Sequence, residues 1–85
     1  MTAGGRFVDW VAVVSSVFTS AAYNPDSRQL YLRFRSGKVY RYFEFPPEQY
    51  DEFLAADSKG GYFAGHIRGQ FRDEEVRELT YSSGE

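Results

Sequence analysis

The sequence predicts an α+β fold, in which a three-stranded antiparallel meander is followed by two short helices packed on one face. Three observations support this. Residues 29–35 alternate apolar and polar side chains, turn-forming residues separate the expected strands, and Pro46-Pro47 ends the strand region just before a segment with helical spacing. Three strands followed by two helices form an antiparallel sheet with the helices on one side.

The length and composition indicate one small folded domain. We expect it to span residues 7–79, with flexible termini at 1–6 and 80–85, because 85 residues can build only one core. The 8 Phe and 7 Tyr indicate a packed interior of large side chains, and the absence of Cys excludes disulfides and iron–sulfur clusters. The longest apolar run, Trp10 to Val14, is too short to span a bilayer, so we expect a cytoplasmic protein with no membrane role.

The first strand is expected within residues 11–23. This segment is rich in Val, Phe, Thr and Ala and stops at the turn-forming residues 24–27. Ser15-Ser16 interrupts its apolar character. The pair marks either a bulge or the start of the strand proper.

Residues 29–35 and Lys38–Phe45 are expected to pair as a tight hairpin. A two-residue loop at Ser36-Gly37 would place Arg41 opposite Leu32, among core side chains, where an unpaired charge is costly. A type I turn with Gly37 in the left-handed bulge position avoids this cost. We favour this second register, because it places both tyrosines of Tyr40-Arg41-Tyr42 beside leucines.

Two helices are expected after the hairpin. Pro47 suits the first turn of a helix that runs to about Ala56, and Ser58 suits the N-cap of a second helix. Asp73 is expected to cap one last helical turn over residues 74–79. The apolar residues on the two main helices are Tyr50, Phe53 and Leu54 on the first, and Phe63, Ile67 and Phe71 at four-residue spacing on the second.

The net charge of −2 hides a gradient along the chain. Residues 28–72 hold eight basic and five acidic side chains, whereas residues 73–85 hold five acids against Arg77. The middle of the chain is therefore mildly basic, and its tail is acidic.

The hairpin, the proline-initiated helix and the Ser-Lys-Gly segment together resemble the KTSC domain. That family is named for a C-terminal extension of some lysyl-tRNA synthetases and also occurs as small free-standing bacterial proteins. The resemblance implies an uncharacterised domain for which RNA binding has been suggested. The position of Phe71 is more usually Tyr in that family. The match runs from about Val14 to Phe71 and comprises Ser15-Ser16, Tyr23-Asn24-Pro25, Leu30 to Phe34, Ser36-Gly37, Tyr40-Arg41-Tyr42, Pro46 or Pro47 with Tyr50, Ser58-Lys59-Gly60, Tyr62-Phe63 and Ile67-Arg68.

One hypothesis is a weak RNA-binding module that uses the outward face of the hairpin. Arginines there would meet phosphates and a tyrosine could stack on a base. The alternative is an ordinary solvated sheet face whose arginines pair with nearby acids. The predicted RNA-binding residues are Tyr31, Arg33, Arg35, Arg41, Lys59 and Arg68.

Lys59 belongs to a glycine-containing loop, Ser58 to Gly61. The backbone amides of this loop lie at the expected start of a helix. Together with Lys59 and Arg68 they could hold a phosphate or carboxylate. The spacing is not that of a P-loop. The other interpretation is a capped turn that uses glycine for its backbone freedom.

No catalytic, metal-binding or cofactor-binding set is expected, so we predict that the protein is not an enzyme. His66 is the one histidine, and the sequence gives it no partner, which favours a partly buried structural residue. Tyr40 and Tyr42 are expected in the core rather than at a site.

The competing hypothesis is a protein-protein interaction module with no nucleic-acid role. Phe7, Val8 and Trp10 could form an apolar patch, or the edge of the hairpin could pair with a partner strand. Trp10 could equally cover the core.

Overall fold

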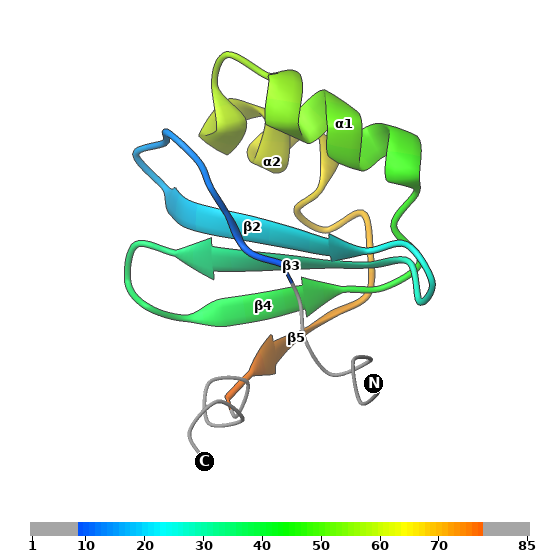
Figure 1. Cartoon of the computed structure of the whole chain (residues 1–85). Helices are drawn as coiled ribbons and strands as arrows, with labels where there is room; N and C mark the ends of the chain where they lie inside the picture. The colour runs from blue at the N-terminus through cyan, green and yellow to red at the C-terminus, as the bar shows by residue number, and fades with distance from the viewer. Residues whose placement is uncertain (1–8, 78–85) are drawn as a thin grey trace.

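The predicted α+β class is confirmed, with five strands in the sheet where three were expected. A computed structural model describes residues 9–77, and Figure 1 shows both helices on one side of the sheet. The strands are antiparallel, and their order in the sheet is their order in the chain. The elements are β1 (Val11–Ala12), β2 (Phe18–Asn24), β3 (Gln29–Phe34), β4 (Val39–Tyr42), α1 (Pro47–Ala55), α2 (Lys59–His66) and β5 (Asp73–Val76).

The segment predicted as one strand over residues 11–23 is two strands that pair with each other. Val11 lies opposite Ala21, so the chain reverses between β1 and β2. The Ser15 hydroxyl accepts hydrogen bonds from the backbone N–H groups of Val17 at 3.0 Å and Phe18 at 3.2 Å. The serine pair interrupts the apolar pattern because it lies in the connection between the two strands.

The hairpin has the favoured register. Leu30 lies opposite Tyr42 and Leu32 opposite Tyr40. Gly37 has a φ of +98°, and its N–H donates to the Phe34 carbonyl at 2.9 Å, which is the expected turn and bulge. This register directs Arg41 to the face away from the helices, so no charge enters the main core.

The expected last helical turn is wrong, because Asp73–Val76 forms β5 at the edge of the sheet. Asp73 pairs with Tyr42 and Val76 with Val39. The free edge of β4 offers backbone hydrogen bonds that a helical turn would leave unused. Residues 78 and 79 of that prediction lie outside the described residues.

Both main helices begin where the sequence indicates. Pro47 is the first residue of α1, and the Ser58 hydroxyl accepts from the Gly61 N–H at 3.0 Å as the cap of α2. Phe71, expected on the second helix, lies beyond its end and packs on Phe45 with ring centres 4.7 Å apart. No helix within residues 9–77 is long and apolar enough to cross a membrane.

The main core lies between the helices and the sheet. Phe18 is fully buried, with ring centres 4.8 Å from Phe34, 5.7 Å from Phe53 and 5.3 Å from Phe63. Tyr42 is 3% exposed, as expected for a core residue, and Tyr40 packs at the margin. The largest fully buried side chains are Phe18, Phe45, Phe53, Leu30, Leu32 and Ile67.

Candidate functional site

The face of the sheet opposite the helices, here called the outer face, carries a set of arginines and aromatic rings. Strand alternation places Tyr31 and Arg33 of β3 there, opposite Arg41 and Val39 of β4. Phe43 follows two residues after Arg41 and therefore points the same way.

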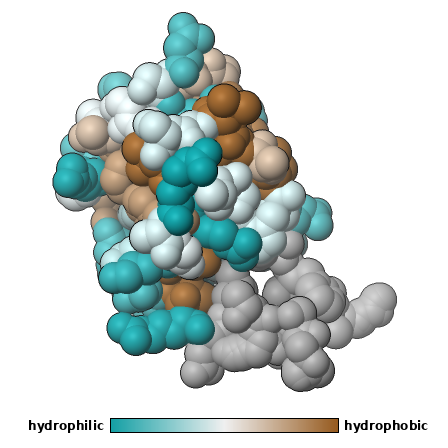
Figure 2. Space-filling model, turned by 90° about the vertical axis from the view of Figure 1, so that its left-hand side faces the viewer, coloured by the Kyte–Doolittle hydropathy of each residue, from teal (hydrophilic) through white to brown (hydrophobic). Residues whose placement is uncertain are grey.

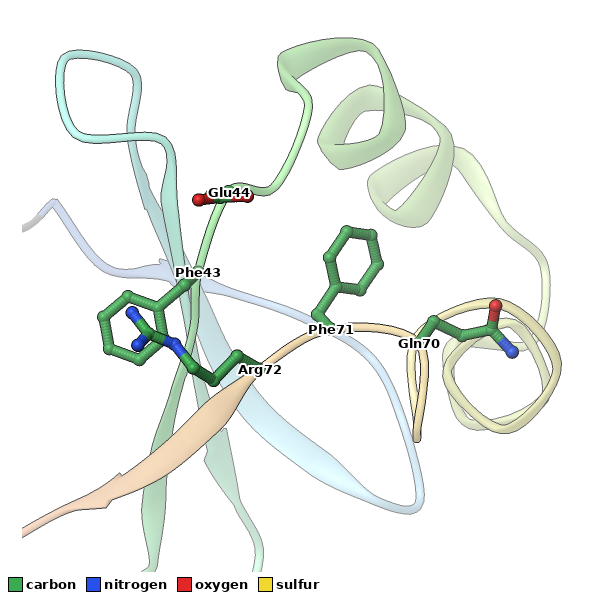
Figure 3. Close-up of a pocket in the computed structure, with 5 residues that line it drawn as sticks. All are labelled: Phe43, Glu44, Gln70, Phe71 and Arg72. Carbon is green, nitrogen blue, oxygen red and sulfur yellow. The ribbon is translucent and has the colours of Figure 1, made fainter.

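Arg72 joins this face from the residue before β5. The Phe43 N–H donates to the Arg72 carbonyl at 2.9 Å, so the two residues lie side by side across the strands. Figure 3 shows the Arg72 guanidinium against the Phe43 ring, on the side away from Phe71.

The guanidinium groups of the outer face lie against its aromatic rings. The guanidinium carbon of Arg33 is 4.6 Å from the Trp10 ring centre, and that of Arg72 is 4.2 Å from the Phe43 ring centre. Arg41 lies between two rings, 6.0 Å from Tyr31 and 5.3 Å from Phe43. These distances are within the range of cation–π attraction. We call this set the arginine–aromatic row; it comprises Trp10, Arg33, Tyr31, Arg41, Phe43 and Arg72.

Tyr31 is the buried member of the row. It is 7% exposed, its hydroxyl contacts the Gln29 side-chain oxygen at 3.0 Å, and Trp10 meets it edge-on with ring centres 6.4 Å apart. Trp10 therefore covers the outer face rather than the main core, and its half-buried ring lies above the tyrosine that was expected to stack on a base. Phe7 and Val8, expected beside Trp10 in an apolar patch, lie outside the described residues.

Arg41 is held by an acid of β5. Its guanidinium forms an ion pair with Glu74, which lies directly opposite in the sheet. Burial alone would lower the pKa of Arg41, but the interactions with Glu74 and Tyr31 together outweigh burial and raise the pKa above its ordinary value. The Arg41 Nε is buried with no hydrogen-bond partner among the described residues. This arginine is thus charged and already occupied by a carboxylate.

The structure divides the six predicted site residues. Tyr31, Arg33 and Arg41 lie together on the outer face, while Arg35 donates from Nε to the Ser15 carbonyl at 3.0 Å near the hairpin turn. Lys59 and Arg68 lie in the helical layer and do not join the row. Sequence position alone could not assign them to a side of the sheet.

The Ser58–Gly61 loop has the geometry of a capped turn. Its serine hydroxyl accepts from Gly61, and the Lys59 ammonium donates to the Ala56 carbonyl at 3.0 Å. Two of the groups that were expected to hold an anion, the Gly61 amide and the Lys59 ammonium, therefore make contacts within the chain.

A hollow of about 560 Å³ lies at the Phe43 end of the row, formed where β4 leaves the sheet and the chain enters β5. Figure 3 shows that Phe43 and Arg72 point to one side of the strands, whereas the Phe71 ring turns the other way. Phe43 and Arg72 were not predicted from the sequence as site residues. Alternation from Arg41 could have placed Phe43, but placing Arg72 required β5. The lining residues are Phe43, Glu44, Gln70, Phe71 and Arg72.

His66 is exposed, and the expectation of a partly buried histidine is wrong. It is the last residue of α2, where Ile67 takes the inward position, and its ring lies 4.6 Å from that of Tyr62. Among residues 9–77 no group of three His, Cys, Asp or Glu side chains could hold a metal ion.

The fold and this surface define a small α+β domain whose distinctive chemistry is a set of stacked arginines. The KTSC domain model matches residues 14–71, which confirms the resemblance seen in the sequence. The chain belongs to the KTSC domain family, whose function is unknown.

The relatives include small proteins and longer enzymes. A protein of Tsukamurella paurometabola is 43% identical over 60 residues, covering 71% of this chain and 90% of its own. A lysine–tRNA ligase of Nostoc sp. is 43% identical over 54 residues, which cover 64% of this chain but only 10% of the ligase. The crystal structure of a KTSC domain protein from Yersinia pestis has a TM-score of 0.81 at 34% identity, covering 84% of this chain and 100% of that one.

Proposed function

We propose that this domain is a non-catalytic RNA-binding module that contacts single-stranded RNA through the arginine–aromatic row. The observation that carries the proposal is the set of contacts between guanidinium groups and aromatic rings on the outer face. Guanidinium groups attract phosphates, and aromatic rings and guanidinium planes both stack on unpaired bases.

The members of the row differ in what they offer a ligand. Arg72 is exposed and Arg33 half-buried, so both reach the surface, whereas Arg41 is paired with Glu74. Phe43 borders a hollow with the Gln70 amide and the Glu44 carboxylate on its rim. An unpaired base lying near Phe43 would find both donors and acceptors for its edge.

The relatives bear on the identity of the ligand, and the charge of the chain bears on the strength of binding. Relatives named as lysine–tRNA ligases contain a similar segment, and this similarity supports the proposal of RNA as the ligand. The chain has a pI of about 5.4, and Glu74 neutralises part of the row, so binding should be weak. Two or three phosphate contacts to a single strand correspond to a slope of about −1.4 to −2.1 for the logarithm of affinity against the logarithm of salt concentration.

The test is an NMR titration of the labelled protein with mixed-sequence single-stranded RNA. We expect the indole of Trp10 and the amides of Arg33, Phe43 and Arg72 to shift at low salt, and the shifts to vanish at high salt. The double variant Arg33→Ala with Arg72→Ala should weaken binding about tenfold or more, because it removes both accessible guanidinium groups.

Lys38→Ala is the control, since it removes one exposed charge from the hairpin turn without touching the row. Unchanged spectra with excess RNA at low salt would refute the proposal. Shifts confined to Lys59 and Arg68 would also refute it, because they would place the contact on the other side of the sheet.

Protein binding remains the second candidate function, favoured by Val14. This side chain is 93% exposed in the connection between β1 and β2. Figure 2 views the end of the molecule that carries this connection and shows apolar side chains in separate patches between hydrophilic ones. The hairpin edge is not available to a partner strand, because β2 pairs with one side of the hairpin and β5 with the other.

A further inference from the structure

A second hollow lies in the helical layer, between α2 and the β3–β4 hairpin. It has a volume of about 440 Å³, within the usual range of small-molecule sites. Its aromatic lining is Phe34, Tyr40, Tyr42 and Phe63; Tyr42 is buried, and the other three are only partly buried. It is therefore an apolar groove that opens to solvent, separated from the arginine–aromatic row by the sheet.

The groove exists because α2 presents small residues to it. Gly60 and Ala64 are four residues apart, so they share one face of the helix, and both line the groove. A Cβ at Gly60 would lie 2.7 Å from a methyl group of Val17, so the helix approaches that loop as closely as glycine allows. A large side chain at Ala64 would fill the remaining space.

One end of the groove carries two opposite charges. Arg68 and Asp73 both line it, and neither forms an ion pair within residues 9–77. Tyr42 lies near both of them. Burial raises the pKa of its hydroxyl, Asp73 raises it further, and Arg68 lowers it.

These polar groups converge on an apolar space, which is the usual arrangement of a small-molecule site. A ligand with only a carboxylate would leave the Asp73 carboxylate near a like charge. A ligand with only an amine would do the same to Arg68. The charges are matched by a molecule that carries a carboxylate and an ammonium group beside an apolar body.

We propose that this groove binds a free α-amino acid with a large apolar side chain. Its carboxylate would lie at Arg68, its ammonium group at Asp73, and its side chain among Phe34, Tyr40 and Phe63. This site goes beyond the proposed RNA contact, because it lies on the other side of the sheet and takes a different class of ligand.

The test is an NMR titration of the full chain with L-phenylalanine and with L-leucine. We expect shifts at Tyr40, Phe63 and Arg68. N-acetyl-L-phenylalanine lacks the ammonium group, L-phenylalanine amide lacks the carboxylate, and glycine lacks the side chain. Each should bind at least tenfold more weakly than L-phenylalanine.

Two variants locate the site. Arg68→Gln removes the carboxylate partner from an exposed position, and Ala64→Leu fills the groove from an exposed helical position. Each should weaken L-phenylalanine binding at least tenfold with the fold retained by circular dichroism. The outer-face variant Arg33→Gln is the control and should leave amino-acid binding unchanged.

The proposal is overturned if neither amino acid shifts these resonances. It is also overturned if the blocked analogues bind as well as the free amino acid, or if Ala64→Leu binds normally. RNA binding is measured separately, and Arg68→Gln should leave it unchanged, so failure at this groove and failure at the arginine–aromatic row are distinguishable.

Discussion

The two faces of the sheet are built from the same strands and carry opposite chemistry. On the helix side, Leu30 and Leu32 of β3 are fully buried beneath α1 and α2. On the outer face, Arg33 of the same strand lies over Trp10, and the buried residues within the described range 9–77 are Ala22, Tyr31 and Val39. Alternate residues of one hairpin thus form the apolar core on one face and a surface of charged and aromatic side chains on the other.

The largest difference in stability between the two faces should appear when an aromatic side chain of each face is replaced by alanine. Phe18→Ala removes a fully buried ring that contacts three others and should lower the free energy of unfolding by about 3–5 kcal/mol. Trp10→Ala, on the outer face, should cost about 1–2 kcal/mol because the indole is only half-buried. Urea denaturation measures both, and equal losses would contradict the proposed division between the faces.

A smaller difference in stability is expected between substitutions at two glycines on different sides of α2. Gly65→Ala places a methyl group where no atom lies within 4 Å, and should stabilise the fold by about 0.5–1 kcal/mol through helix propensity. Gly60→Ala forces a methyl group against Val17 and should instead destabilise by about 1 kcal/mol or more. Thermal unfolding of the two variants tests this. A gain in stability from both substitutions would show that α2 does not pack tightly on that loop.

The smallest effect on stability is expected at the ion pair of the outer face. Glu74→Gln should change the free energy of unfolding by less than about 1 kcal/mol, because Arg41 and Glu74 are both partly exposed. Under the proposed function it frees Arg41 for phosphate and should tighten RNA binding at low salt. Glu75→Gln is the matched control, since Glu75 pairs with Arg77 and not with the row. Equal affinities of the two variants for RNA would count against a competing role for Glu74.

The sequence predicts the local parts of this fold well. The hairpin register follows from the cost of burying Arg41, and the helix starts follow from Pro47 and Ser58. All of these depend on residues close together in the chain. The resemblance to the KTSC family likewise rests on short segments whose order the sequence displays directly.

The parts that were missed depend on distant contacts. The sequence of Asp73–Val76 is mostly acidic and has little strand propensity. The segment forms a strand because it pairs with the edge of β4 that no other strand occupies. Trp10 covers the outer face only because Tyr31 and Arg33 are presented there. The arginine–aromatic row could therefore be predicted in its β3 and β4 members but not in Trp10 or Arg72.

The strand order also bears on how the chain reaches its folded state. Each strand from β1 to β4 pairs with its neighbour in the chain through a short connection, whereas β5 reaches β4 only across both helices. Closing that longer loop costs more chain entropy than forming any of the three hairpins between β1 and β4. Glu74 can therefore meet Arg41 only when the loop that contains both helices has closed. Until then no acid neutralises the charge of Arg41. The outer face is therefore more positively charged before β5 pairs with β4 than in the fully folded domain.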